Sequence, residues 1–399
     1  MSRAFELTRL PEGFIDDPYP WYDALREEDP VHAMEGGGVF LSRYDDAVAV
    51  YRDPRASSDK KIEFKPKFGD SPLYEHHTTS LVFNDPPLHT RVRSLITGAM
   101  NQRAIARMES GVATLVDQLL DDFPEQAAID FIADFAARIP VEVIGNLLDI
   151  PGAERAPLRD WSIAILSGLE PKPSAPMLER GNRAVVEFKS CLERIVADRR
   201  RKPGDFDSDV LTRLIQGEKD GTRLDTLELY HNCIFLLNAG HETTTNLIGN
   251  GLWLLLKDRS QLARLLENPA LIPVAIEEML RCEGPIQLNN RRLTAPMDLG
   301  GRTLPEGTSI TIGIGAANRD PRQFADAARF DVARKPNRHV AFGHGEHACA
   351  GMNVARMEAR IAFSRLLARF PAIAAAGEPE RDRRVRFRGF RRFPVRPKG

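Results

Sequence analysis

The chain has 399 residues, of which 42% are hydrophobic, and this proportion is ordinary for a packed globular protein. Its 55 basic and 56 acidic residues leave a formal net charge of −1, so no global electrostatic field favours nucleic acid or an anionic membrane as a partner. The N-terminus has no apolar run of signal-peptide length, and no charge-free stretch is long enough to cross a bilayer. We therefore expect a soluble protein with no nucleic-acid or membrane partner.

Amphipathic helical patterns dominate the chain and lie at 19–28, 103–123, 132–148, 178–201, 224–257 and 352–370. Strand-like pieces are fewer and shorter, and they lie at 30–34, 37–43, 298–315 and 385–396. No internal repeat, low-complexity segment or Gly/Ser-rich linker divides the chain. These patterns predict one domain over residues 1–399, with a fold that is mainly α with small β-sheets.

Residues 57–87 are rich in Pro, Gly and charge, which predicts a long loop before a helix that begins near Pro87. Loops of this length inside a compact domain are usually functional and often cover a pocket, and the alternative is a mobile insertion. The segment has a basic character, which comes from Lys60, Lys61, Lys65, Lys67, His76 and His77. A carboxylated substrate is one explanation of this charge, and a solvated loop surface is the explanation that we prefer.

The four cysteines are scattered along the chain, at Cys191, Cys233, Cys282 and Cys349. Their spacing indicates neither a disulfide framework nor a CxxC metal site, and it fits a reducing cytoplasm. The first three lie within helical patterns and are interpreted as small buried hydrophobes. Cys349 differs because it stands between Gly345 and Gly351, just before a helix that starts at about Met352. Backbone N–H groups and the helix dipole should lower the pKa of this thiol and make it a good soft metal ligand.

Other metal and cofactor motifs can be tested by their spacing. His344, His347 and Cys349 form an HxxHxC cluster, but a closed zinc site needs a fourth ligand and no partner motif lies nearby. The sequence HGE at 344–346 lacks the PCxxC of zinc deaminases, and HETTT at 241–245 lacks the second histidine of HExxH. The sequence GIGAAN at 313–318 fails the dinucleotide-binding fingerprint, because Asn318 replaces the third glycine. A zinc hydrolase stays as an alternative.

Four motifs together resemble the cytochrome P-450 superfamily, the haem-thiolate monooxygenases, in its bacterial soluble form. FGHGEHACAG at 342–351 is similar to the family's FxxGxHxCxG haem-binding loop, and EMLR at 278–281 is similar to its ExxR pair. AGHETT at 239–244 resembles the oxygen-activation motif, and DPPLHTRVR at 85–93 resembles the HxxxR of the family's C helix. The motifs occur in the family's order and span most of the chain. ExxR alone would be an ordinary helix pair.

The resemblance implies a cytochrome P-450 fold in which haem b lies between a long distal helix and the cysteine loop with its following helix. It makes Cys349 the thiolate ligand of the haem iron, whose electron donation favours O–O cleavage with O2 as co-substrate. Positions that match other haem contacts are Ala239, Gly240 and Gly351. Positions that match partners of the haem propionates are His89, Arg93, Arg291 and His347, and the adjacent Arg292 leaves the register at Arg291 open by one residue. Glu278 and Arg281 would brace the cysteine loop with an arginine of the PNRH segment, expected at Arg338.

The predicted helix over 224–257 is interrupted in its middle by Gly240, Glu242 and three threonines. By resemblance, its middle passes over the distal haem face, where Gly240 leaves room for dioxygen. Glu242 and Thr243 then form the acid–alcohol pair that delivers protons, and Thr243 can also bond back to an i−4 carbonyl. Some members carry aspartate at the acid position. The alternative is a paired core carboxylate beside a polar packing seam.

The resemblance also places a substrate pocket, which would be mostly apolar and would fit a small hydrophobic organic molecule. The residues expected to line it are Phe68, Leu81, Val82, Phe83, Phe235, Asn238, Ala239, Ile286, Gln287, Leu288, Asn289 and Phe390. Each could equally be a core residue.

No reductase motif occurs in the chain, so electrons from NAD(P)H must arrive through a separate protein. By resemblance this is a ferredoxin or flavodoxin with its reductase, which should dock near Cys349 on Arg338, His344, Arg356 and Arg360. We expect a cytoplasmic monomer that oxidises its substrate as a haem-thiolate monooxygenase. The alternatives are a peroxygenase, which usually lacks the acid–alcohol pair, a non-catalytic haem-binding protein, and the zinc hydrolase.

Overall fold

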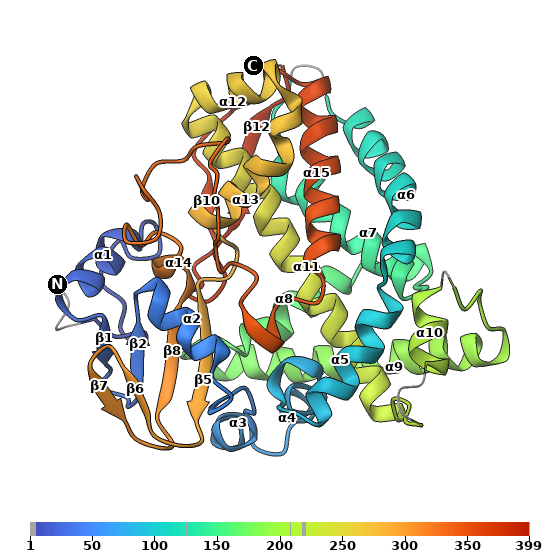
Figure 1. The fold of residues 1–399 in the computed structure, drawn as a ribbon. Coiled ribbons are helices and arrows are strands. Elements are labelled where there is room, and N and C mark those ends of the chain that lie inside the picture. Colours follow the sequence, from blue (N-terminus) through green and yellow to red (C-terminus); the bar gives the residue numbers. More distant parts are fainter. Residues whose placement is uncertain (1–4, 125–126, 208, 218–220, 399) are drawn as a thin grey trace.

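A computed structural model of the protein describes residues 5–124, 127–207, 209–217 and 221–398. As predicted, the fold is mainly α with small β-sheets. Most helices form one large body, and the principal sheet lies at its side beside the N-terminal segment (Figure 1). Within the described residues, none of the helices combines the length and the apolar character that crossing a membrane requires.

The helices of the described residues are α1 (Tyr19–Glu28), α2 (Tyr44–Arg52), α3 (Lys61–Phe68), α4 (Pro72–Thr79), α5 (Leu88–Ala99), α6 (Gln102–Asp121), α7 (Arg138–Leu147), α8 (Leu158–Ser167), α9 (Ala175–Arg201), α10 (Val210–Gln216), α11 (Thr226–Lys257), α12 (Arg259–Glu267), α13 (Ile272–Cys282), α14 (Ile314–Ala317) and α15 (Met352–Arg369). Two short helical turns matter for the site, η2 (Leu81–Phe83) and η6 (Gly345–His347).

The principal sheet has five strands in the order β1 (Val31–Ala33), β2 (Val39–Leu41), β8 (Ser309–Gly313), β5 (Leu288–Leu293) and β3 (Ala56–Ser57). Only β2 and β8 pair in parallel, and the other pairs are antiparallel. A three-stranded sheet has the order β4 (Ile129–Asp130), β12 (Pro394–Arg396) and β9 (Ala374–Ala375). Two antiparallel pairs complete the sheets, β6 (Met297–Leu299) with β7 (Arg302–Leu304) and β10 (Glu380–Arg381) with β11 (Phe390–Arg392).

Helix α11 is the axis of the helical body. A capping box starts it, because the Asp225 carboxylate accepts from the Glu228 backbone N–H and the Glu228 carboxylate accepts from the Asp225 N–H. Its 32 residues span about 48 Å at 1.5 Å per residue. It contacts α7, α8, α9, α13 and α15, and most of its side chains are buried. The helix predicted over 224–257 is therefore confirmed to within two residues.

The long loop predicted over 57–87 is wrong, since most of this segment is helical. Helices α3 and α4 and the turn η2 occupy it, and only short links join them. Phe64 and Phe68 are one helical turn apart and pack on one another, and Leu73 is fully buried. Ser71 caps α4 by accepting from the Tyr74 backbone N–H. The Pro and charge content masked this apolar spacing in the sequence.

A buried ion cluster fixes α13 to the segment that leads to Cys349. Glu278 and Arg281 form an ion pair with no exposed side-chain surface, at Nε–Oε2 2.7 Å and Nη2–Oε1 2.8 Å. The third member is Arg334, whose Nε donates to Glu278 at 2.9 Å, and not the expected Arg338. The chain turns between these positions, so Asn337 also donates to Glu278 while the exposed Arg338 offers its carbonyl to the Tyr44 hydroxyl.

Replacing Arg334 by alanine should lower the free energy of unfolding by about 2 kcal/mol, because hydrogen bonds to charged groups contribute about 1.5–3 kcal/mol each. Arg338→Ala removes an exposed guanidinium four residues later and should change it by less than about 0.5 kcal/mol. Urea unfolding followed by circular dichroism measures both values. Equal losses in the two variants would contradict the assignment of Arg334.

Candidate active site

Cys349 lies on a tight loop that its glycines make possible. The Cys349 backbone N–H donates to the Phe342 carbonyl at 2.8 Å, which closes the loop. Gly345 has a φ of 71°, and a Cβ there would lie 2.5 Å from the carbonyl oxygen of Tyr51 in α2. No side chain fits this position, since backbone cannot move aside as a flexible side chain can. Helix α15 starts three residues after Cys349 and contacts α11.

The pKa of the Cys349 thiol differs from the sequence-based expectation. Burial raises it, while the Gly351 backbone N–H and the nearby Arg93 and Arg356 guanidinium groups lower it, and burial outweighs them. A backbone donor therefore stabilises the thiolate as expected, but in the protein alone it does not bring the pKa of the thiol below its usual value. A bound cation at the sulfur would reverse this balance, because metal coordination deprotonates a thiol. The thiols of Cys233 and Cys282 also have raised pKa values, of about 12, because they are buried among core residues.

Four basic residues from three parts of the chain meet near Cys349. The rings of His89 on α5 and His347 in η6 lie 3.9 Å apart between centroids. Burial, together with the positive charges of Arg93 and Arg291, lowers the pKa of His89 to about 4 and that of His347 to about 3. Neither His89 ring nitrogen has a hydrogen-bond partner among the described residues. Two arginine side chains and a histidine ring without a hydrogen-bond partner in the described chain thus lie together near Cys349.

Arg291 and Arg292 are neighbours in β5, and only one of them can face this basic group. Arg291 is buried, with its guanidinium 5.4 Å from the centre of the Tyr51 ring and hydrogen-bonded to Asn289 and the Asn290 carbonyl. Arg292 points to the other face of the strand, because its guanidinium lies near Gly307. Arg291, rather than Arg292, therefore lies with His89 and His347 near Cys349. In the described part of the chain, no carboxylate forms an ion pair with Arg93 or Arg291.

The middle of α11 has one face that is not covered by the protein. Phe235, Ala239 and Thr243 are spaced four residues apart, and Ala239 is exposed although its neighbours Asn238 and His241 are buried. The Thr243 hydroxyl donates to the Ala239 carbonyl at 2.7 Å, as the sequence predicts.

Gly240 has a structural role that the sequence did not reveal. A Cβ there would lie 2.9 Å from Cδ1 of Ile144, so the glycine allows α7 to pack closely against α11.

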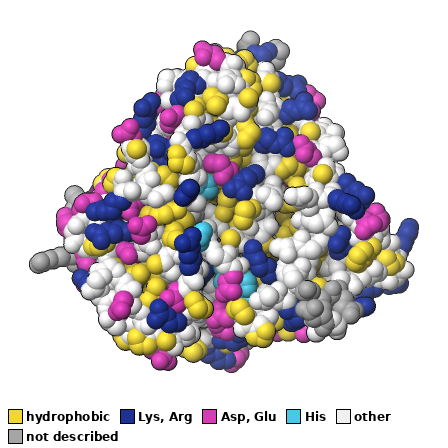
Figure 2. Space-filling model, viewed as in Figure 1, with side chains coloured by type: hydrophobic (Ala, Val, Ile, Leu, Met, Phe, Trp, Pro, Cys, Tyr) yellow, Lys and Arg dark blue, Asp and Glu magenta, His cyan; other side chains and the backbone are white. Residues whose placement is uncertain are grey.

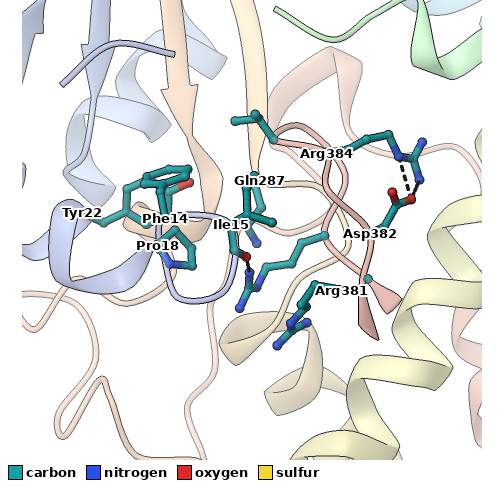
Figure 3. Close-up of a pocket in the computed structure, with 11 residues that line it drawn as sticks. Phe14, Ile15, Pro18, Tyr22, Gln287, Arg381, Asp382 and Arg384 are labelled. Atoms are coloured by element: carbon teal, nitrogen blue, oxygen red, sulfur yellow. Dashed lines mark hydrogen bonds and ion pairs between the residues drawn. The ribbon is translucent and has the colours of Figure 1, made fainter. Parts of the chain in front are cut away.

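Glu242 is buried on another face of the helix and has an unexpected partner. Its carboxylate forms an ion pair with Arg384, and its Oε2 has no hydrogen-bond partner among the described residues. Arg384 also donates to Asp382 at 2.8 and 2.5 Å, and Figure 3 shows these two side chains facing one another. Burial lowers the pKa of Arg384 to about 10 and raises that of Asp382 to about 6. The sequence analysis missed both, and the arginine-rich run at 381–388 was the available signal.

An apolar cluster lies between α3, the end of α8 and the C-terminal segment. It contains two of the expected substrate residues, and its members are Phe64, Phe83, Leu166, Leu169, Ile286 and Phe387. The expected Phe390 is not among them, because it packs on Phe393 and Trp253 in the main core, and Phe387 takes its place.

The other expected pocket residues are divided between several environments. Asn289 and the exposed Val82 line a pocket beside this cluster, whereas Leu288 packs in the N-terminal core and Gln287 donates to the Gly284 carbonyl. Strand alternation explains this division, since neighbouring residues point to opposite faces. Phe68 and Leu81 are buried in the core around α9, Phe235 packs against it, and Asn238 contacts His76.

These features fit haem. Unpaired basic groups suit two buried propionates, which need cationic or hydrogen-bonding partners, and an uncovered apolar stretch of α11 suits a flat ring. Zinc fits poorly, because no group of three His, Cys, Asp or Glu side chains in the described residues is placed to hold a metal ion.

Comparison with known proteins agrees with this geometry. The family model described as Cytochrome P450 matches residues 169–390. The chain is 36% identical to Cytochrome P450 107B1 of Saccharopolyspora erythraea over 98% of both chains, and 36% identical to Cytochrome P450 monooxygenase PikC of Streptomyces venezuelae over 98% of this chain and 94% of that one. The structure of P450BioI in complex with acyl carrier protein ligated to hexadec-9Z-enoic acid superposes with a TM-score of 0.90, at 32% identity over 96% of this chain and 99% of that one.

The chain therefore belongs to the cytochrome P450 family. It is a haem-thiolate monooxygenase, an enzyme that uses haem and O2, binds an organic substrate and requires a redox partner. The predicted family, fold and enzyme class are confirmed.

Cys349→Ala should abolish the red-shifted Soret band of the reduced carbon-monoxide complex and abolish monooxygenation, because we assign Cys349 as the protein ligand of iron. The matched controls Cys191→Ala, Cys233→Ala and Cys282→Ala remove thiols buried elsewhere and should keep the band. Ferrous carbon-monoxide difference spectra measure this. A thiolate spectrum that survives in Cys349→Ala would refute the assignment.

Proposed function

We propose that this enzyme inserts one oxygen atom from O2 into a small, mainly hydrophobic organic molecule. The observation that supports this most is the convergence of the Cys349 loop with His89, Arg93, Arg291 and His347, beside a helix with one uncovered face. Haem bound there supplies the oxidising chemistry, with electron donation from the cysteine sulfur. The intact Glu242–Thr243 pair favours the monooxygenase over the peroxygenase alternative.

Each group has a separate task in this proposal. Arg93, Arg291 and the two histidines bind the propionates and fix the orientation of the ring. Thr243 Oγ1 holds a proton donor on the uncovered face of α11, where its own hydrogen bond to Ala239 sets its position. Glu242 Oε2, which has no partner among the described residues, carries the proton inward from Arg384 and Asp382 at the other side of the helix.

Thr243→Ala should leave haem and substrate binding nearly intact while the ratio of product to NAD(P)H consumed falls by about tenfold or more, because positioned proton transfer contributes about 10²–10⁴-fold. Thr245→Ala is the matched control, since Thr245 also bonds back to an i−4 carbonyl but is buried on the other side of the helix. Product and released hydrogen peroxide are measured together. If Thr245→Ala uncouples NAD(P)H consumption from product formation and Thr243→Ala does not, the assignment of Thr243 as the alcohol of the pair is wrong.

We further propose that the electrons come from NAD(P)H through a ferredoxin or flavodoxin that docks near Cys349. The structure changes which basic residues we expect to contact this redox partner. Arg356 is bound to Glu277 and Arg360 to Glu109, and Figure 2 shows Lys and Arg interspersed with Asp and Glu on this face. Arg52 and Arg338 are exposed on either side of Tyr44, and no carboxylate in the described residues pairs with them. These two are the better anchors for an acidic partner.

Arg338→Glu should raise the KM for an acidic ferredoxin about tenfold and should reduce the dependence of turnover on salt, since exposed charges act over about 8 Å at physiological ionic strength. Arg201→Glu, at the exposed end of α9, is the control and should have no effect. Steady-state rates against ferredoxin concentration at low and high salt measure this. Full turnover with NAD(P)H alone would contradict the need for a partner.

The remaining proposals concern the setting of the enzyme. We propose that residues 1–399 form one domain, supported by relatives that match 98% of the chain. We also propose a cytoplasmic monomer, and the four unbridged cysteines support a reducing compartment.

A further inference from the structure

The pocket that lies beside the apolar cluster, lined in part by Val82 and Asn289, has a volume of about 100 Å³. Its walls come from α3, η2, the link after α8, strand β5 and the C-terminal segment. The apolar side chains Phe64, Phe83 and Leu169 belong both to this pocket and to the cluster that contains Ile286 and Phe387. The polar pocket and the apolar cluster therefore share part of their lining.

The charged lining of this pocket is strongly unbalanced. Four cations face one acid, and they are Lys60, Lys67, Arg291 and Arg386 against Glu63. Lys60 pairs with that acid at 2.6 Å. Counting these side chains leaves a charge of +3 from four cations minus one anion, in a chain whose total charge is −1.

Among the described residues, the other cations of the pocket hydrogen-bond only to neutral acceptors, and the Glu170 carboxylate acts on Lys67 and Arg386 only through its charge. Lys67 Nζ donates to the backbone carbonyl of Glu170 at 2.7 Å. The Arg386 guanidinium donates to the carbonyls of Leu169 and Leu288, each at 3.1 Å, and to Asn290 Oδ1 at 2.7 Å. Burial lowers the pKa of Lys67 to about 8 and also lowers that of Arg386. An anion in the pocket would therefore gain charge-assisted hydrogen bonds and would stabilise both cations.

Arg386 is held in place by a separate contact. The Glu170 carboxylate accepts from the backbone N–H groups of Val385 at 2.9 Å and Arg386 at 3.4 Å. The backbone that carries the guanidinium is thus fixed to the link after α8. A preorganised cation binds an anion more tightly than a mobile one, because less conformational freedom is lost on binding.

This arrangement changes the interpretation of the basic segment over 57–87. Lys61 and Lys65 are exposed and pair with Asp59 and Asp70, as a solvated surface would. Lys60 and Lys67 instead face the pocket from the same helical region. The preferred explanation of a solvated surface holds for the first two lysines and fails for the other two.

We propose that this pocket is a subsite for the carboxylate of the substrate, with Lys67 and Arg386 as its principal ligands and Lys60 beside them. The apolar remainder of the substrate then lies along Phe83, Ile286 and Phe387 toward the uncovered face of α11. Arg291 is left to the haem propionates. The inference rests on the proposed monooxygenase function and narrows its substrate to amphiphiles that carry one carboxylate.

The first test compares ligands on the haem-loaded enzyme. Decanoic, dodecanoic and tetradecanoic acids are titrated while the ferric spin state is followed, each beside its methyl ester and its primary alcohol. At least one acid should bind about tenfold or more tightly than its ester and alcohol, because only the acid offers a charged acceptor. An ester that binds as tightly as the acid at every chain length would overturn the proposal.

The second test uses two substitutions in the pocket and a matched control in α3. Lys67→Gln and Arg386→Gln should each weaken binding of the acid by about tenfold and leave binding of the ester unchanged. Lys65→Gln lies two residues from Lys67 and faces solvent, so it should change neither. Isothermal titration calorimetry on the same samples gives the affinities independently of the spectrum. Equal weakening of acid and ester would show a role in shape rather than charge and would refute the subsite.

The carbon-monoxide spectrum separates failure of this inference from failure of the proposed function. A normal thiolate band with no binding of any acid would overturn the subsite and leave the monooxygenase intact. Loss of haem in Lys67→Gln or Arg386→Gln, but not in Lys65→Gln, would assign these cations to the propionates instead. Binding of a carrier-protein acyl thioester by an enzyme that ignores the free acids would also overturn the subsite, because a thioester has no carboxylate.

Discussion

The active site depends on two arginines that the protein holds near Cys349 without an ion-pair partner in the described part of the chain. His89, Arg93, Arg291 and His347 meet beside Cys349, and no carboxylate in the described residues forms an ion pair with either arginine. Burying such charge alone is unfavourable, and an anionic cofactor offsets that penalty. Haem bound there would therefore stabilise the fold. It would also stabilise the Cys349 thiolate, because the iron would supply the positive charge that the buried sulfur lacks.

The C-terminal segment connects the chemistry to the substrate. Arg384 forms an ion pair with Glu242 of α11. Arg386 lines the cationic pocket, and Phe387 belongs to the apolar cluster. Residues 384–387 are not part of a strand, and the bends at Val385 and Arg386 send neighbouring side chains to different places. One short segment can thus set the proton path and substrate recognition at once, and a shift of one residue would disturb both.

Much of the site could be predicted because its motifs are local. The glycines around Cys349 and the helix that follows it are close in sequence. The same holds for Glu278 with Arg281, and for Thr243 with the Ala239 carbonyl to which its hydroxyl donates. Partners far apart in sequence could not be found in this way. Arg334, rather than Arg338, reaches Glu278 because the chain turns between them, and Arg384 reaches Glu242 from 142 residues away. Neither contact leaves a periodic signal.

The sequence alone predicted the family and the mainly helical fold, which are confirmed, and it proposed the thiolate cysteine and the acid–alcohol pair, since residue type and short spacing carry that information. The three-dimensional packing alone decided which basic residues face a pocket and which face water. Lys65 and Lys67 are the same residue type two positions apart on α3, yet one pairs with exposed Asp70 and the other donates to the backbone carbonyl of buried Glu170. Charge is a property of the residue, whereas burial and partners are set by helices and strands that the chain brings together from elsewhere.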